Sequence, residues 1–267
     1  PRSTLFPYTT LFRSALVAHS AADMQVLVDH FAKAAAQFSL KINIKKTECM
    51  YQPIKLIQPP PEPEVIMIDQ NPLVLATRFT YLGSTVSSTA KIDKELRNRL
   101  GKASAAFGKL QHRLWNNRHV SIRVKCKVYR AVVLSSLLYG AEAWTIYRTQ
   151  VKKLSAFMMR QLRDIMSVKW YDKITNEEIL RRANMPCMAD ILIERNLRWL
   201  GHVHRMDDDR LPKQLLYSQL KEGKRNQGRP RLRFKDVAKR NMNWRDINMS
   251  SWQTLARNRV AWRTATK

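Results

Sequence analysis

Apolar residues recur at two different spacings along this chain of 267 residues. In the first third, a short apolar run at 15–18 precedes a stripe at helical spacing over 24–38 and a strict alternation over 40–44. These patterns predict, in order, a buried strand, an amphipathic helix and a half-buried strand. Two apolar runs within 65–75 flank a polar turn and predict a hairpin.

Beyond residue 87 the alternation stops and only helical spacing remains, which predicts an α+β protein that is mostly α. Gly140 is placed to end one helix, and Thr175-Asn-Glu-Glu178 fits a capping box that begins another. The expected helices are 88–114, 121–139, 151–165, a short one after Thr175, 189–203 and one after Ser251.

The chain is strongly basic. Lys and Arg number 48 against 21 Asp and Glu, a net charge of +27, which is too large for solubility alone and predicts a polyanionic partner. Nucleic acid is the first candidate and an anionic membrane surface the second. No stretch approaches the ~18 uninterrupted apolar residues of a membrane helix, so we expect nucleic acid and no membrane as the partner. No obligate protein partner is evident.

The three cysteines, Cys49, Cys126 and Cys187, lie far apart and are odd in number. This suits a reducing intracellular compartment, nuclear or cytoplasmic, and gives neither a disulfide framework nor the close cysteine pair of a zinc site. Asp207-Asp-Asp209, after two histidines, could be interpreted as a metal-dependent nuclease site, but adjacent acids on a loop rarely converge on one ion. We expect no metal site in the chain as written.

The stretch Ser39-Leu-Lys-Ile-Asn-Ile-Lys-Lys-Thr-Glu48, following the amphipathic helix, resembles the fourth palm motif of non-LTR (LINE-type) retrotransposon reverse transcriptases. The resemblance implies that Lys46, with Lys45 as the competing choice, lies near the phosphates of the incoming nucleotide and acts as a general acid. The alternative is a strand edge with solvated lysines.

Phe79-Thr-Tyr-Leu-Gly83 predicts a strand that ends at a turn, and it resembles the primer grip of the same family. The resemblance implies that Phe79, Tyr81, Leu82 and Gly83 position the 3′ end of the primer. The alternative is an ordinary strand with a glycine turn.

A basic helix follows where the resemblance places the polymerase thumb, which holds a duplex by its phosphates. A merely solvated helix face normally mixes signs, whereas only Asp93 and Glu95 oppose the cations of this helix. The expected phosphate contacts are Lys91, Lys94, Arg97, Arg99, Lys102, Lys109 and Arg113.

Three further segments resemble, in this order, segments of the C-terminal region of the same retrotransposons. They are 196–206 (with Leu-Gly-His), 210–213 and Gly228-Arg-Pro-Arg231. Trp199 is expected in the core. The Gly-Arg-Pro-Arg segment is expected to be a flexible basic phosphate-binding loop, and its resemblance to a minor-groove hook gives the alternative. In either case Arg229, Arg231 and Arg233 are expected to contact nucleic acid.

Residues 4–14 resemble the in-frame translation of a sequencing adapter. In the family, the stretch that resembles 15–20 follows an aromatic-Ala-Asp-Asp turn with two metal-binding carboxylates, and no such pair precedes Ala15 here. The resemblance implies that the intact parent enzyme uses Mg²⁺ to copy an RNA template onto a DNA primer. For this chain we expect no cofactor and no polymerisation.

The sequence therefore predicts a C-terminal fragment of an RNA-directed DNA polymerase that retains binding to the backbone of an RNA–DNA hybrid or duplex DNA. The alternatives are a non-catalytic nucleic-acid-binding remnant and a domesticated chromatin-associated protein. The expected regions are 1–14 as a disordered artefact, 15–87 as a remnant of the antiparallel palm sheet with the primer-grip hairpin, 88–147 as thumb-like helices, 148–209 as a helical C-terminal region and 210–267 as a basic tail with short helices.

Overall fold

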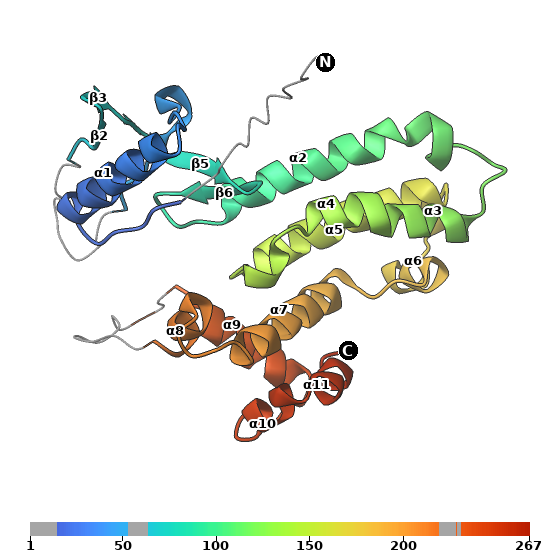
Figure 1. Ribbon diagram of the computed structural model, residues 1–267. Coiled ribbons are helices and arrows are strands. Elements are labelled where there is room, and N and C mark those ends of the chain that lie inside the picture. The colour runs from blue at the N-terminus through green and yellow to red at the C-terminus, as the bar shows by residue number, and fades with distance from the viewer. Residues whose placement is uncertain (1–14, 53–63, 219–227, 229–230) are drawn as a thin grey trace, which may run out of the picture. The chain divides into compact units, whose positions relative to one another are not determined.

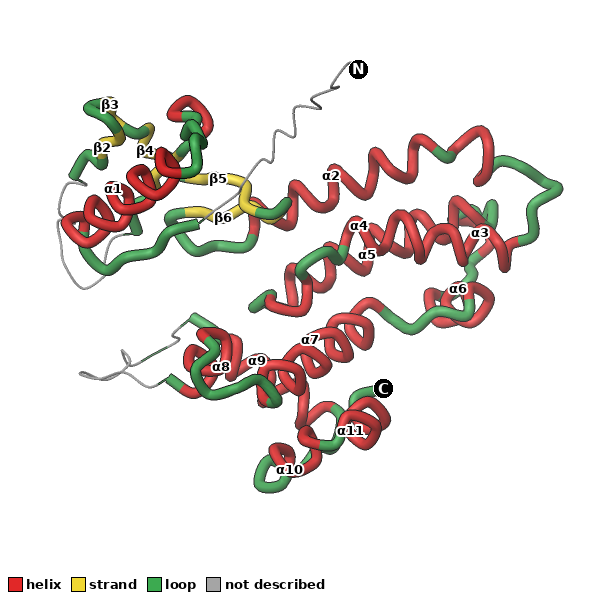
Figure 2. The backbone as a smooth tube through the Cα atoms, viewed as in Figure 1, coloured by secondary structure: helices red, strands yellow, loops and turns green. Residues whose placement is uncertain are grey.

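The computed structural model divides the chain into two compact units, Pro1–Glu95 and Leu96–Lys267 (Figure 1). The structure describes residues 15–52, 64–218, 228 and 231–267. The segment expected to be an artefact (1–14) and the expected contact Arg229 lie outside these residues. Among the residues described, strands occur only in the first unit and helices make up nearly all of the second (Figure 2), as the change in apolar spacing near residue 87 predicts.

The first unit combines one long helix with short strands. Its elements are α1 (Ala21–Gln37), the 3-10 helix η1 (Ile44–Lys46), β1 (Glu48–Cys49), β2 (Met67–Ile68), β3 (Asn71–Pro72), β4 (Val74–Leu75), β5 (Arg78–Tyr81) and β6 (Ser84–Ser87). The strands pair as β1 with β4 in parallel, and as antiparallel hairpins β2–β3 and β5–β6. The two hairpins confirm the strands predicted at 65–75 and 79–83.

Two-residue turns close both hairpins. Asp69 and Gln70 have φ values of 46° and 64°, and Leu82 and Gly83 have φ values of 46° and 82°. Positive φ at both central residues defines the turn whose twist matches that of paired strands. In the second hairpin Phe79 faces Val86 and Tyr81 faces Ser84 across the ladder.

The two strands predicted before residue 45 are wrong. Residues 15–18 form no strand, and Val17 is 84% exposed. At 40–44 the chain turns at Ser39, where φ is 55°, and Asn43 then caps η1 by accepting a hydrogen bond from the Lys46 backbone N–H at 3.2 Å. A side chain that bonds its own backbone in this way competes with strand pairing.

The core of the first unit is small. Val28 of α1 packs in one buried cluster with Ile66, Ile68 and Leu73. The Gln25 side chain of α1 makes two hydrogen bonds to the backbone of β2. Its amide N–H donates to the Met67 carbonyl and its carbonyl accepts from the Met67 N–H, both at 2.9 Å. Met24 of the predicted α1 stripe packs against this cluster, whereas Leu27, Phe31 and Phe38 are exposed, Phe38 by 77%.

The second unit is helical throughout its described part. Its elements are α2 (Asp93–Lys109, which begins in the first unit), the π-helix η2 (Gln111–Trp115), α3 (Ile122–Val128), the π-helix η3 (Tyr129–Leu134), α4 (Ser135–Leu137), η4 (Ala141–Ala143), α5 (Arg148–Ile165), η5 (Trp170–Asp172), α6 (Asn176–Ala183), α7 (Met188–His204), α8 (Leu211–Tyr217), α9 (Phe234–Trp244), α10 (Trp252–Arg257) and α11 (Arg259–Ala265).

The helices expected from apolar spacing are confirmed, with changes at their ends. The first begins at Asp93 and not at Ser88. The second runs through α3, η3 and α4 and ends at Gly140, whose φ is 73°. Thr175 caps α6 by accepting from the Glu178 backbone N–H, which confirms half of the predicted capping box. The Glu178 carboxylate accepts from Arg181 and Arg182 instead of closing the other half. The helix predicted after Ser251 is divided at Asn258, whose side chain caps α11.

Helix α7 organises the C-terminal half of this unit. It packs against α5, α8, α9, α10 and α11. Its Gly201 lies against Trp262 of α11 so closely that a Cβ atom there would come 2.2 Å from the indole nitrogen. That nitrogen donates to the Leu197 carbonyl at 2.8 Å. The glycine therefore lets an indole ring, 2% exposed, sit directly on the helix backbone.

Candidate nucleic-acid interface

The palm-motif lysines lie at the exposed end of η1. Lys45 and Lys46 are both exposed, and the capping bond from Asn43 fixes the backbone beneath them. Thr47 extends this local network, since its hydroxyl donates to the Asn43 carbonyl at 2.9 Å. The structure thus presents two cations on a short capped turn and not on the predicted strand edge.

The primer-grip residues share the β5–β6 hairpin. Phe79 and Tyr81 are half-buried, and Leu82 at the turn is 56% exposed. The carboxylate of Glu95, itself 5% exposed, accepts a hydrogen bond from the Thr85 backbone N–H at 2.7 Å. This buried contact fastens the hairpin to the first turn of α2. A role in holding a primer stays a prediction.

Most of the predicted basic residues of α2 and η2 reach the surface. Arg97, Lys102, Lys109 and Arg113 are exposed, and Lys94 is half-buried. Lys91 is exposed just before the helix. These positions leave the side chains accessible to phosphates, as the prediction requires.

Arg99 is the exception and corrects the predicted set. Its side chain is 4% exposed, and its guanidinium lies over the ring of Tyr139, 4.5 Å from the centroid. Arg99 follows Leu96 by three residues and precedes Ala103 by four, so it shares the apolar stripe of α2. Its cation is used inside the fold, where it stacks on an aromatic face.

Sequence reasoning missed a second group of cations, on α3 and α5. Residues 96–163 contain fifteen Lys and Arg and a single acidic residue, Glu142, a net charge of +14. The depletion of acids was the available signal, and it extends well beyond the predicted thumb helix. The exposed members on α3, η3 and α5 are Arg123, Lys127, Arg130, Arg148, Lys152, Lys153 and Arg160.

Some cations of this stretch serve the fold. Lys125 is 7% exposed and donates to the Trp115 carbonyl at 2.7 Å. Trp115 in turn stacks on Phe107, with ring centroids 5.0 Å apart. Arg163 donates to the Ile174 carbonyl at 2.9 Å, which ties α5 to the loop before α6. We therefore define the basic helix set as the exposed residues alone: Arg97, Lys102, Lys109, Arg113, Arg123, Lys127, Arg130, Arg148, Lys152, Lys153 and Arg160.

The predicted hook residues are only partly described. Arg231 is exposed, and Arg233 pairs with Asp236 at 3.2 Å at the start of α9. The Arg233 backbone N–H also donates to the Asp236 carboxylate, so this arginine takes part in a helix cap. A minor-groove contact by this segment stays a prediction.

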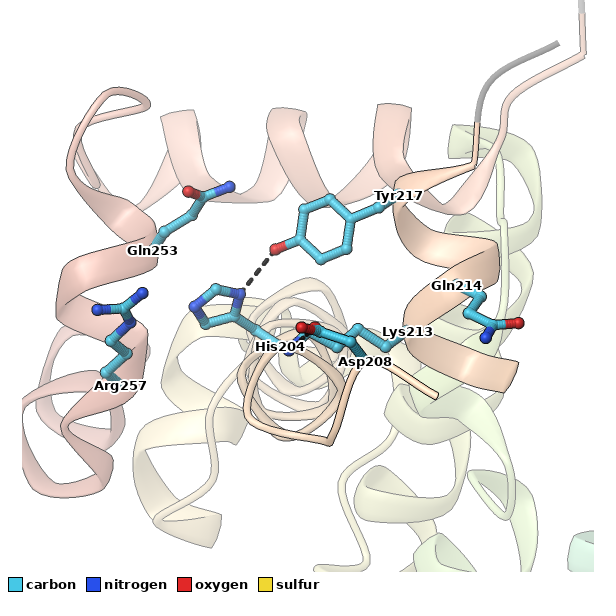
Figure 3. Close-up of a pocket in the computed structure, with 7 residues that line it drawn as sticks. All are labelled: His204, Asp208, Lys213, Gln214, Tyr217, Gln253 and Arg257. Atoms are coloured by element: carbon cyan, nitrogen blue, oxygen red, sulfur yellow. Dashed lines mark hydrogen bonds and ion pairs between the residues drawn. The ribbon is translucent and has the colours of Figure 1, made fainter. Parts of the chain in front are cut away.

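A pocket lies where the end of α7, the loop after it, α8 and α10 meet (Figure 3). The segment 196–206 contributes His204 to its lining, and the segment 210–213 contributes Lys213. His204 Nδ1 and the Tyr217 hydroxyl lie 2.7 Å apart and point toward each other across it. Lys213 pairs with Asp208 at 2.7 Å and donates to the Met206 carbonyl at the same distance. Gln253 and Arg257 lie on the facing helix.

Burial and charge set the protonation of this pocket. Burial lowers the pKa of His204 below its usual value, and the nearby Lys213 lowers it further. The hydrogen bond from Lys213 lowers the pKa of Asp208, while burial raises that of Tyr217. Asp208 is thus engaged by a lysine. In the described part of the chain, no three His, Cys, Asp or Glu side chains gather to hold a metal ion.

The three cysteines are free thiols. Burial raises the pKa of each, which disfavours the reactive thiolate. Cys187 caps α7 by accepting from the Asp190 backbone N–H. Among the residues described, no helix is both long and apolar enough to span a membrane.

Comparisons with known proteins relate the chain to transposons. It is 24% identical over 258 residues to an uncharacterized transposon-derived protein of Caenorhabditis elegans, a match covering 92% of this chain and 90% of that protein. It is 21% identical over 189 residues to an RNA-directed DNA polymerase from the X-element transposon of Drosophila melanogaster, covering 70% of this chain and 20% of the polymerase. No family model matches the chain. No solved structure matches it.

These similarities support a transposon-related protein and confirm that part of the expectation. The identity to the polymerase is low and spans only a fifth of its length, so the assignment of single regions to palm, primer grip and thumb stays a prediction.

Proposed function

We propose that the chain is a nucleic-acid-binding part of a non-LTR retrotransposon reverse transcriptase, corresponding to sequence that follows the catalytic carboxylates. It grips the phosphate backbone of an RNA–DNA hybrid or duplex DNA and does not itself transfer nucleotides. The similarity to a transposon RNA-directed DNA polymerase supports the lineage. The basic helix set supports the binding.

The charge distribution is the observation that carries this proposal. The segment that holds the basic helix set, residues 96–163, has a net charge of +14 and one acidic residue. Structural cations such as Arg99 and Lys125 are buried, but the members of the set remain in solvent. A segment with this excess of positive charge attracts a phosphate backbone, whose contacts carry no sequence information.

In the described residues no three His, Cys, Asp or Glu side chains gather to hold the Mg²⁺ ions that the resemblance implies, and we propose no catalytic step by this chain. Lys46 would have no bound nucleotide to protonate within this chain.

Binding to a duplex of random sequence, measured by fluorescence anisotropy at increasing salt, tests the proposal. If the chain neutralises ~6–10 phosphates, its affinity should fall about 10³–10⁵-fold between ~50 and ~200 mM salt. Lys152→Glu/Lys153→Glu should weaken binding about 10–100-fold and reduce the slope against log salt by about two.

A matched variant separates local contact from net charge. Lys33→Glu/Lys41→Glu makes the same charge change at two exposed lysines of the first unit and should alter affinity by less than about three-fold. If both variants lost the same affinity for the duplex, net charge alone would explain the binding and no local contact would be needed. Affinity independent of salt would refute backbone binding altogether.

The similarity to the worm protein, which covers 90% of that protein, favours a second candidate: a non-catalytic, transposon-derived nucleic-acid-binding protein. Both candidates bind, so primer extension on an RNA template with Mg²⁺ is the informative assay. Incorporation above a mock preparation would overturn the absence of catalysis in both.

A further inference from the structure

The turn between α5 and α6 presents two adjacent aromatic rings to solvent. Trp170 is 89% exposed, the largest exposed fraction of any large hydrophobic side chain in the described residues, and Tyr171 is 62% exposed. The rings meet edge to face, with centroids 5.8 Å apart and planes at 72°. An indole this exposed contributes little to the core, although tryptophan is a residue that folding normally buries.

The backbone beneath these rings is fixed. The Lys169 N–H donates to the Asp172 carboxylate at 2.7 Å, and the Asp172 N–H donates to the Lys169 carbonyl at 3.2 Å. Lys173 then reverses the chain with φ of 50°. Arg163 holds the far side through the Ile174 carbonyl and the Asn176 side chain, at 2.9 and 2.8 Å. A rigid turn that carries bare rings loses little conformational entropy when it binds a ligand.

Cations surround the aromatic pair. Lys169 and Lys173 flank it and are exposed, and the single acid of the turn, Asp172, is occupied by its cap. Gln111 of η2 donates to Asp164 in the last turn of α5 at 3.2 Å, which brings the start of η2 beside the start of this loop. The pair therefore adjoins the helices that carry the basic helix set.

We propose that Trp170 and Tyr171 stack on unpaired bases of a nucleic acid whose phosphates are held by the basic helix set. Every base has a π face, so aromatic rings set among Lys and Arg suit single-stranded nucleic acid without sequence preference. A protein-docking site would instead continue into an apolar patch, whereas the residues that directly flank this pair in the chain, Lys169, Asp172 and Lys173, are charged and exposed. The inference rests on the proposed backbone binding and adds single-stranded segments to its ligands.

The test uses the full chain and two labelled probes of one sequence, a 20-nucleotide single strand and its duplex. Trp170→Ala/Tyr171→Ala should lower affinity for the single strand about 5–100-fold and change affinity for the duplex less than about two-fold. Trp170→Phe/Tyr171→Phe keeps both rings and should restore most of the loss. Trp244→Ala removes another exposed indole, 66% exposed, and should leave both affinities unchanged.

A direct readout comes from 2-aminopurine placed in the single strand, whose fluorescence should be quenched by the wild-type chain and not by the alanine variant. Equal losses on single strand and duplex, or no quenching, would overturn the inference while backbone binding stands. If the wild-type chain binds neither probe, the proposed function itself fails. Loss of binding to anionic vesicles with single-strand affinity intact would assign the rings to a membrane surface and overturn base stacking.

Discussion

The two units differ in charge and in core. Residues 1–95 carry ten Lys and Arg against eight acids, a net charge of +2, whereas residues 96–267 carry 38 against 13, a net charge of +25. Among the described residues, the first unit contains a buried cluster of four apolar residues, and the second contains a cluster of seven that joins α7, α9, α10 and α11. The segments that resemble the palm motif and the primer grip lie in the nearly neutral unit, and nearly all of the excess positive charge lies in the other.

This difference separates the two parts of the expected function. A catalytic palm needs carboxylates and a precise nucleotide site, whereas binding a backbone needs only accessible cations on a stable scaffold. The second unit has both the cations and the scaffold. We therefore expect binding and stability to follow the second unit when the chain is divided or altered.

Dividing the chain has the largest expected effect. A protein of residues 88–267 should bind duplex DNA within about three-fold of the full chain, because nearly all the net charge remains. A protein of residues 1–92 should lose more than about 100-fold and show no cooperative unfolding, since its core is small. Anisotropy and thermal circular dichroism measure the two effects. If residues 1–92 bound duplex DNA strongly, the affinity would lie in the first unit, which would contradict the prediction.

Gly201→Ala should destabilise the second unit by about 1–3 kcal/mol, because the added Cβ would collide with the Trp262 ring. Gly108→Ala is the matched control in an open position of α2, with no atom within 4 Å of the added Cβ. It should leave stability unchanged or raise it by up to about 1 kcal/mol. Urea unfolding measures both, and equal effects would show that the indole does not constrain Gly201.

Two arginines of α2 should give opposite results. Arg99→Ala removes a buried cation over Tyr139 and should cost roughly 1–2 kcal/mol of stability with the salt slope of binding unchanged. Arg97→Ala removes an exposed cation and should lower the salt slope by about one with stability unchanged. A change of salt slope in the Arg99 variant would restore that residue to the interface.

The smallest expected effect is on pH dependence. Burial favours neutral His204, so its pKa in the folded chain lies below its usual value. As the pH falls through about 6.5, the unfolded state therefore binds a proton at His204 before the folded state does. This difference lowers the free energy of unfolding on acidification. His204→Gln should flatten the fall in melting temperature between about pH 7 and pH 5. His202→Gln, at an exposed position two residues earlier, is the control.

Helices were predictable where spacing and caps agreed. Thr175 and Gly140 mark helix ends in the sequence and act as such in the structure. The strand predicted at 40–44 failed because five alternating residues carry little information and Asn43 bonds the backbone of Lys46 instead. Arg99 was misplaced because charge was weighed without its place on the apolar stripe.

The exposed aromatic pair lay beyond sequence reasoning for another reason. Whether Trp170 packs inward or outward depends on the cap made by Asp172 and the reversal at Lys173, which no periodicity describes. The same holds for the pocket of His204 and Tyr217, because α10, which supplies Gln253 and Arg257, lies more than 30 residues after α8 in the sequence.

The contact between α7 and Trp262 also sets an order of events during synthesis. The indole that covers Leu197 follows it by 65 residues. At about 5–20 residues per second, a ribosome needs several seconds to make that stretch. Until then the apolar side of α7 around Leu197 and Leu200, buried in the finished fold, has no cover from α11. If the chain is released early or the ribosome stalls during this interval, the apolar face of α7 stays exposed and can bind chaperones or be cleaved by proteases.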